Sequence, residues 1–203
     1  MIHNTQFRAK ITRAEIEQLP SKKFNGEIFF IDSFPALDKV MPELLNETLF
    51  GFDTETRPAF KKGTSNVVSL MQLSTADKAF LFRLNKIGLT EELCTILGNP
   101  VILKAGVAIH DDLGGLKRLK KFIPDGFIDL QDYVKDFGIE DNGLKKLAAN
   151  ILGIRISKRQ QTSNWDKDKL SPAQIEYAAT DAWVCHEIYH MLHRIKRING
   201  YGD

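Results

Sequence analysis

Residues 49–55, Leu-Phe-Gly-Phe-Asp-Thr-Glu, set two acids in an apolar segment, which limits what this chain can fold into. The apolar and aromatic residues favour a central β-strand. Side chains alternate along a strand, so Asp53 and Glu55 project from the same face. Acids are costly in a central strand unless they have a partner. One such partner would be Mg²⁺ or Mn²⁺, because both ions prefer oxygen ligands. The alternative is that the two acids lie on a strand face that is exposed to solvent.

Apolar runs and turn residues predict an alternating order of strands and helices along the chain. Antiparallel strands come first and alternating helices and strands follow, which is typical of one mixed α/β domain. The predicted strands are residues 26–32, 49–55, 66–73, 79–84, 100–105 and 127–130. The predicted helices are residues 35–46, 91–97, 111–122, 131–137, 143–152 and 172–197.

Length and composition exclude several classes of protein. The chain has 203 residues, of which 43% are hydrophobic and 27% charged, so it is neither disordered nor fibrous. We expect a polar, basic N-terminal arm over residues 1–25, in which Thr12 and Glu15 form a capping box, and one domain over residues 26–198. A net charge of +2 is too small for a histone-like binder, although it permits a local basic face.

The cysteine content indicates a reducing compartment. Cys94 and Cys185 lie apart, so they predict neither a zinc site nor a disulfide framework. No apolar run reaches the roughly 18 residues of a membrane span, and the first residues contain no apolar signal core. We therefore expect a cytoplasmic protein with no membrane partner.

A second pair of polar residues lies on the last predicted helix. Tyr177 and Asp181 are four positions apart, so they share one helix face. Such pairs are common on helix surfaces. This helix, however, is apolar nearly all round, so burial of a tyrosine and an acid there calls for an explanation.

A third group of polar residues follows the strand predicted to end at residue 105. In Ala-Gly-Val-Ala-Ile-His-Asp-Asp, residues 105–112, either Asp111 or Asp112 could cap the next helix. One cap does not account for two acids. His110 has no second histidine nearby at ligand spacing, so we expect a solvated residue rather than a metal ligand.

Together these segments resemble the DEDD superfamily of 3′–5′ exonucleases, in the branch that contains RNase D and Werner-type enzymes. Asp53 and Glu55 match its Asp-x-Glu motif, and Asp112, rather than the acid before it, matches the second motif. Tyr177 and Asp181 match the Tyr-x-x-x-Asp motif that marks the DEDDy subgroup. Residues 68–73, 143–149 and 163–182 also resemble family segments, and the resemblance spans about residues 26–195.

The resemblance implies an RNase H-like α/β fold, with a five-stranded mixed sheet flanked by helices on both faces. It implies stepwise hydrolysis of a nucleic acid from its 3′ end to nucleoside 5′-monophosphates, with two Mg²⁺ or Mn²⁺ ions. By analogy, Asp53 would contact both ions. Glu55 and Asp181 would complete the site beside the attacking water, Asp112 would hold the second ion directly or through water, and Tyr177 would orient the water.

Substrate contacts are also implied by the resemblance, although most have a simpler alternative. Relatives often carry a bulky residue where this chain has Gly114 and Gly115, so one stacking contact is absent here. Core packing is an alternative for Phe60 and Met71, and a solvated charge for each cation. The expected contacts to the terminal nucleotide, to bases and to phosphates are Phe52, Thr54, Phe60, Met71, Leu73, Lys61, Lys62, Lys158 and Arg159.

Three functions remain open at this point. The first is a 3′–5′ exonuclease acting on a nucleic acid with a free 3′ end, single-stranded or frayed. DNA is favoured over RNA, because RNase D carries further helical domains that the 203 residues do not include. The second is an RNase D-like exoribonuclease in RNA processing. The third is an inactive nucleic-acid-binding domain of the same fold. Inactive relatives usually lack one of the four acids, whereas this chain retains all four.

Overall fold

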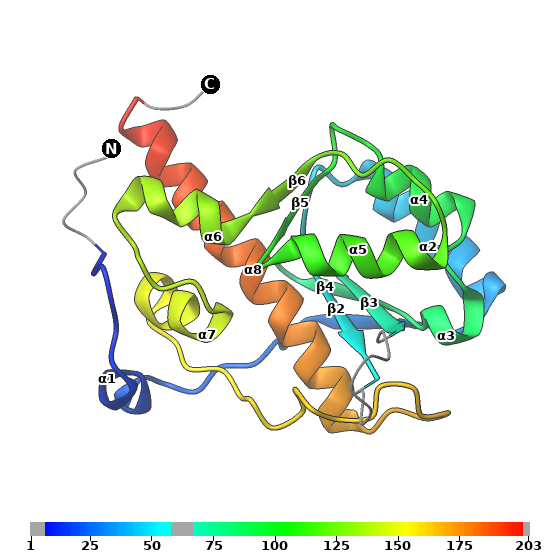
Figure 1. Cartoon of the computed structure of the whole chain (residues 1–203), viewed down its shortest axis with the longest axis horizontal. Coiled ribbons are helices and arrows are strands. Elements are labelled where there is room, and N and C mark those ends of the chain that lie inside the picture. The colour runs from blue at the N-terminus through cyan, green and yellow to red at the C-terminus, as the bar shows by residue number, and fades with distance from the viewer. Residues whose placement is uncertain (1–6, 58–66, 201–203) are drawn as a thin grey trace.

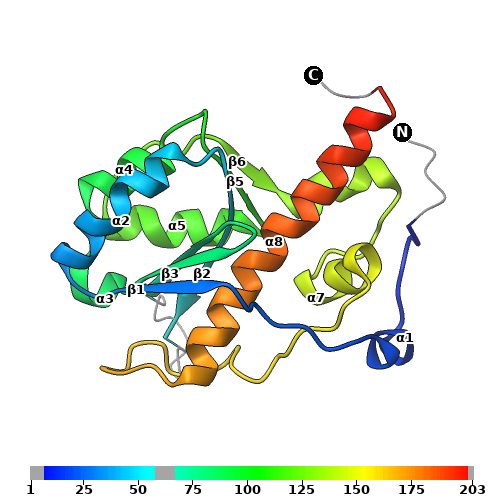
Figure 2. The same ribbon diagram turned by 180° about the vertical axis from the view of Figure 1, so that it is seen from behind.

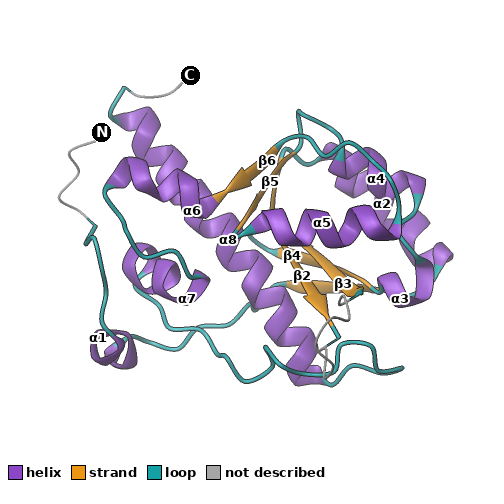
Figure 3. Cartoon of the chain, in the orientation of Figure 1, coloured by secondary structure: helices purple, strands orange, loops and turns teal. Residues whose placement is uncertain are grey.

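The computed structural model describes residues 7–57 and 67–200. A six-stranded mixed sheet forms its centre, in the order β1-β4-β3-β2-β5-β6, and helices lie on both faces (Figures 1 and 3). The strands are β1 (Glu27–Ile31), β2 (Leu49–Thr56), β3 (Val68–Ser74), β4 (Lys78–Phe82), β5 (Leu103–Gly106) and β6 (Phe127–Asp129).

Strands β2, β3 and β4 form the antiparallel meander that the sequence predicts. β1 pairs parallel to β4, β5 pairs parallel to β2, and β6 pairs parallel to β5. β2 therefore lies inside the sheet, as its apolar residues indicate. The RNase H-like fold is confirmed, but the sheet has six strands where the resemblance implied five, because the short segment predicted at residues 127–130 pairs with β5.

The helices divide between the two faces of the sheet (Figures 1 and 2). α2, α4 and α5 contribute to one large apolar cluster with the sheet, and α8 contributes to the clusters of the opposite face. The helical segments are α1 (Arg13–Gln18), α2 (Phe34–Asn46), α3 (Leu84–Ile87), α4 (Glu91–Leu97), α5 (Ile109–Leu119), α6 (Leu130–Tyr133), the 3₁₀ turn η1 (Val134–Phe137), α7 (Leu144–Leu147), the π-helical η2 (Ala148–Leu152) and α8 (Pro172–Ile198).

Helix α8 crosses one face of the sheet, and its C-terminal end extends beyond the sheet (Figure 2). It begins as predicted, with Ser171 as its N-cap, Gln174 completing a capping box and Pro172 in the first turn. Gly51 of β2 allows the helix to lie against the strand, because a Cβ atom at this position would stand 1.8 Å from the carbonyl oxygen of Ala182. This close approach brings the middle of α8 to the strand that carries the first two acids.

The described part of the N-terminal arm packs against the domain. Thr12 and Glu15 form the predicted capping box of α1. The amide of Ile11 donates to Asp141 Oδ2 at 2.7 Å, and the amide of Phe24 donates to Thr180 Oγ1 at 3.0 Å. The arm therefore reaches α8, and Figure 1 shows it running beside the segment that leads from α7 into α8.

Several element boundaries differ from the prediction by a few residues, and one short helix was not predicted. β5 begins at Leu103 rather than at residue 100, because the Asn99 side chain accepts a bond from the Val101 amide and holds the preceding residues in a turn. The short helix α3 had no recognisable sequence signal. Within residues 7–57 and 67–200, no helix has the length and apolar character needed to cross a bilayer.

Candidate active site

Three carboxylates meet where β2 passes under α8. Asp53 and Glu55 come from β2 and Asp181 from α8, and each offers an oxygen that lies within 4.8 Å of the others. The period of two in β2 points both strand acids towards the helix, as expected. Asp53 is partly exposed, whereas Glu55 and Asp181 are buried.

The fourth acid, Asp112, joins this group from the other side of β2. It lies in the first turn of α5 and accepts a hydrogen bond from the hydroxyl of Thr54, which alternates with the two strand acids. Its charge contributes to the raised pKa of Asp53 and of Glu55. The four carboxylates thus lie within electrostatic range of one another.

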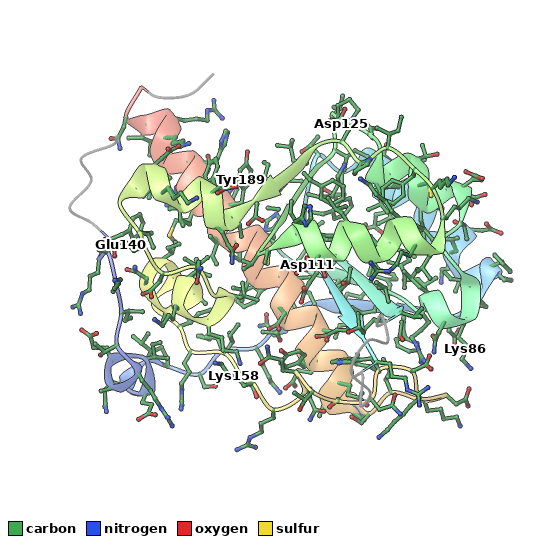
Figure 4. All side chains as sticks on the ribbon, viewed as in Figure 1. Lys86, Asp111, Asp125, Glu140, Lys158 and Tyr189 are labelled. Atoms are coloured by element: carbon green, nitrogen blue, oxygen red, sulfur yellow. The ribbon has the colours of Figure 1, made fainter. Side chains whose placement is uncertain are left out.

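The two neighbouring acids of α5 have different surroundings. The side chain of Asp111 is fully exposed and lies 3.6 Å from that of His110, also exposed, whereas Asp112 is partly buried (Figure 4 labels Asp111). The simpler alternative, that one of them caps α5, does not hold, because no side chain caps this helix from its N-cap residue, Ala108. Asp129, at the end of β6, accepts from the amides of Ala108 and Ile109, each at 3.2 Å. Because Asp129 caps the helix terminus, the Asp112 carboxylate remains available to the Thr54 hydroxyl.

Burial makes every one of these acids hard to ionise. It is the largest cause of the raised pKa in each case, and it raises the pKa of Asp112 and of Asp181 to about 6. For Glu55, burial and the charges of Asp53 and Asp181 raise the pKa to about 10. The pKa of Asp53 is raised well above its ordinary value by burial, followed by the charges of Asp181 and Asp112. Without a counter-charge, the cluster resists full ionisation.

The donor set fits a divalent cation. Within the described residues, no lysine or arginine forms an ion pair with any of the four acids. Asp181 Oδ1 is buried and has no hydrogen-bond partner. The oxygen-only set suits a hard cation such as Mg²⁺ or Mn²⁺ better than one that prefers sulfur or nitrogen. Asp53, Glu55 and Asp181 are the residues that could hold such an ion.

Tyr177 lies one helical turn before Asp181 and is buried. Its ring packs against Trp165, with centroids 6.0 Å apart. Burial, followed by the charges of Asp181 and Glu55, raises the pKa of the Tyr177 phenol above its ordinary value. The hydroxyl therefore stays protonated at neutral pH and is available as a hydrogen-bond donor.

The loop that carries Trp165 is held in place by residues that directly follow β4. Arg83, which is almost fully buried, donates to the carbonyl oxygens of Lys167 and Asp168. Asp166, in the same loop, accepts a bond from Asn85 at 3.0 Å. The support behind the Tyr177 ring is thus fixed by contacts remote from the acids.

Lys145 of α7 is a charged neighbour that the sequence reasoning missed. Its Nζ donates to the carbonyl oxygen of Ser157 at 2.6 Å. Burial lowers the pKa of Lys145 to about 8, and the charge of Asp181 partly opposes this shift. Nothing in the local sequence pattern distinguishes Lys145 from the adjacent Lys146.

The expected substrate contacts divide into three groups. Phe52, Met71 and Leu73 are buried in the cluster that faces α2, α4 and α5, so the expectation that they contact substrate is corrected to a packing role. Phe60, Lys61 and Lys62 lie outside the described residues. The other three line two hollows beside the acids: Thr54 in one of about 360 Å³, Lys158 and Arg159 in one of about 570 Å³.

Comparison with known proteins gives one family. Residues 28–196 match a family model described as 3′–5′ exonuclease. The bifunctional 3′–5′ exonuclease/ATP-dependent helicase WRN of Mus musculus is 30% identical over 201 residues, which cover 93% of this chain and 14% of that protein. Ribonuclease D of Haemophilus influenzae is 36% identical over 102 residues, covering 49% of this chain and 25% of that one.

The fold comparison agrees with the family match. The crystal structure of the Aedes aegypti Nibbler EXO domain superposes with a TM-score of 0.79 at 22% identity, and covers 90% of this chain and 95% of that domain. At this identity the likeness concerns the fold. The chain spans between 14% and 40% of the length of the first curated relatives that it matches.

Proposed function

Because the chain belongs to the DEDDy-type 3′–5′ exonuclease family, we propose that it hydrolyses a nucleic acid stepwise from a free 3′ end and releases nucleoside 5′-monophosphates. The observation that carries this proposal is the meeting of Asp53, Glu55 and Asp181 within 4.8 Å, beside a buried tyrosine. A structural role for three uncompensated acids at one point would cost stability and bring no packing in return.

In this proposal the acids act as metal ligands. Asp53, Glu55 and Asp181 would hold one Mg²⁺ or Mn²⁺, and Asp112 would help to hold a second. When bound, such ions lower the pKa of water and stabilise the charge that develops on the phosphate and on the leaving 3′ oxygen. Thr54 fixes the carboxylate of Asp112 through its hydrogen bond, so that this side chain meets the substrate already oriented.

Tyr177 has a positioning role in this mechanism. Its protonated hydroxyl donates a hydrogen bond to the attacking water and holds the water in line with the scissile bond. The raised pKa of Tyr177 excludes general-base work near pH 7, since the deprotonated phenol is not populated. Trp165 keeps the ring in place from behind.

A digestion panel tests the proposal. The substrates are 5′-labelled single-stranded and double-stranded DNA and RNA of one sequence, each with Mg²⁺, with Mn²⁺ and with EDTA. We expect a ladder shortened from the 3′ end with either metal and no product in EDTA. The Asp53→Asn variant is the matched control for contaminating nucleases. Equal digestion in EDTA, or by Asp53→Asn, would refute the proposal.

The same panel addresses the other two candidate functions. The relatives include a ribonuclease D and an exonuclease/helicase, so the preference for DNA over RNA stays a prediction that the relative rates decide. An inactive binding domain would bind the labelled strands and leave them intact. We also propose that the protein works in a reducing compartment such as the cytoplasm, which its two free cysteines support.

A further inference from the structure

A basic groove of about 570 Å³ opens next to the acids on the α8 side. Tyr177 and Asp181 form part of its wall, so it is continuous with the candidate active site. Three segments that are far apart in the sequence build the rest: residues 21–23 of the arm, residues 155–160 before α8, and the first turns of α8. Its basic side chains are Lys22, Lys23, Arg155, Lys158 and Arg159.

Most of this positive charge is uncompensated. Lys23 pairs with Glu176 at 2.6 Å. Of the described residues, none forms an ion pair with Lys22, Arg155, Lys158 or Arg159, and all four are exposed. Like charges gathered in this way repel one another, so the groove favours an anionic occupant.

The backbone holds these cations in place. The amide of Lys22 donates to the carbonyl oxygen of Arg155, and the amide of Arg155 donates to that of Pro20, both at 2.9 Å. The bond from the Phe24 amide to Thr180 Oγ1 fastens the arm to α8 one residue before Asp181. Figures 1 and 2 both show the arm and the stretch before α8 lying side by side, and Figure 4 labels Lys158 on that stretch.

Packing alone does not account for this arrangement. Phe24 is buried and packs near Trp183, so its ring anchors the arm in the core. The exposed side chains of Lys22 and Arg155 contribute nothing to the core. Yet the strand-like bridge at Ser21 and Arg155 sets them on adjoining segments at the edge of the groove.

The hollow on the other side of the acids has the opposite character. It is lined by Glu55, Asp111 and Asp112, with Arg118 as its one basic residue among those described, and its volume is about 360 Å³. A polyanionic strand entering the site is therefore drawn to the basic groove, and the smaller acidic hollow is the poorer route for its phosphates.

We propose that the basic groove binds the sugar–phosphate backbone of the strand that carries the reacting 3′ end, and that the N-terminal arm forms one wall of it through Lys22. This inference rests on the proposed function. Contacts of this kind are independent of base sequence and sensitive to salt. The reacting 3′ end belongs to one strand, so the groove contacts the backbone of that strand, of DNA or of RNA.

The test measures binding separately from hydrolysis. Fluorescence anisotropy of 5′-labelled 12-nucleotide dT and U strands is followed in EDTA from 50 to 200 mM KCl, for the full chain and two double variants. The groove variant is Lys22→Gln with Arg155→Gln. The control is Lys39→Gln with Lys121→Gln, which removes two exposed cations on α2 and after α5. Comparing dT with U shows which sugar the groove prefers.

We expect the groove variant to bind roughly tenfold more weakly at 50 mM KCl, and its log–log salt slope to be smaller by about 1.4, since each single-strand phosphate contact contributes about 0.7. The control should match the wild type. Poly-glutamate, added at equal charge, should displace the wild-type complex poorly. Displacement as efficient as that by unlabelled strand would show a general anion site and overturn the assignment to nucleic acid.

The outcomes for the groove and for the proposed function are distinct. If the groove and control variants bind equally well while the wild type still shortens labelled strands, the proposed role of the groove is refuted and the proposed exonuclease activity stands. Groove-dependent binding without hydrolysis in Mg²⁺ or Mn²⁺ supports the groove and refutes the exonuclease. A wild-type protein that binds neither strand overturns the groove whatever its activity.

Discussion

The hydroxyl of Thr54 donates to the carboxylate of Asp112, and this single bond joins the central strand to the helix on the opposite face. Asp53 and Glu55 flank Thr54 and point the other way, towards α8. One strand thus presents two acids on one face and orients a third acid through the other. The bond also opposes the burial that raises the pKa of Asp112.

Replacing Thr54 with valine removes the hydrogen bond and keeps the shape of the side chain. We expect the Thr54→Val variant to stay folded but to need a higher Mn²⁺ concentration for half-maximal activity, because Asp112 loses its orientation and its pKa rises further. The shift should be roughly tenfold. Thr54→Ser, which restores the hydroxyl, should recover most of the wild-type metal dependence; failure to recover would assign the effect to packing.

Asp111 and Asp112 provide a matched pair of substitutions. Asp112→Asn should lose nearly all activity, whereas Asp111→Asn, at a fully exposed side chain, should keep most of it. Both variants remove one negative charge from the first turn of α5, so a general effect on the helix dipole is the same in each. The rate on a labelled single strand in Mn²⁺ distinguishes them. The reverse ranking would place the ligand one residue earlier.

The stability of the metal-free protein should depend on pH through its acids. A carboxyl whose pKa is raised on folding favours the folded state below its unfolded pKa, and that stability is lost as the pH rises towards the folded value. For Asp181 the window runs from about 3.8 to about 6. Glu55 extends it towards 10.

In EDTA, the Asp181→Asn variant should therefore be more stable than the wild type at pH 7.5, by on the order of 2 kcal/mol, and the gap should narrow at pH 5. Saturating Mn²⁺ should reverse the order at pH 7.5, because the wild type keeps its ligand. Thermal melts at the two pH values measure this. A gap that does not change with pH would show that the acids are already neutralised by another group.

Removing the Tyr177 hydroxyl separates positioning from metal binding. Tyr177→Phe keeps the ring against Trp165 and all four acids. We expect the single-turnover rate to fall roughly tenfold to a hundredfold, with the Mn²⁺ concentration for half-maximal rate nearly unchanged. Wild-type turnover in this variant would leave the tyrosine a packing residue alone.

The contact at Gly51 should tolerate no side chain. Because an added Cβ would stand 1.8 Å from the Ala182 carbonyl oxygen, Gly51→Ala forces α8 away from β2. We expect a loss of about 3 kcal/mol or more in the free energy of unfolding. Gly143→Ala is the control, since an added Cβ there meets nothing within 4 Å. Chemical denaturation of the two variants compares them, and equal stability would contradict the packing.

The parts of the site that local periodicity controls could be predicted from the sequence. Alternation in β2 paired Asp53 with Glu55, and the four-residue spacing in α8 placed Tyr177 beside Asp181. The same alternation assigns Phe52 to the opposite face, where the structure buries it, so the signal against a substrate contact was already present.

The tertiary contacts could not be read from local patterns. Asp129 caps α5 from 20 residues further along the chain, so no capping signal adjoins the helix. Lys145 reaches Ser157 only because α7 and the stretch before α8 lie together. The groove joins residues 21–23 to residues 155–160, and a pairing over that separation depends on the completed sheet and on α8.

The close contact between Gly51 and Ala182 fixes the position of α8 at this point, and Asp181 is the adjacent residue. The rest of the helix could rotate slightly about this contact, which would then act as a pivot. From Ala182 to Ile198 the helix extends about 24 Å at 1.5 Å per residue. A sway of about 3° around the pivot would move the far end by roughly 1 Å, but the backbone at Asp181 by under about 0.1 Å, at a rise of 1.5 Å per residue. A displacement of the C-terminal half of α8 would therefore leave the backbone at Asp181 almost unmoved.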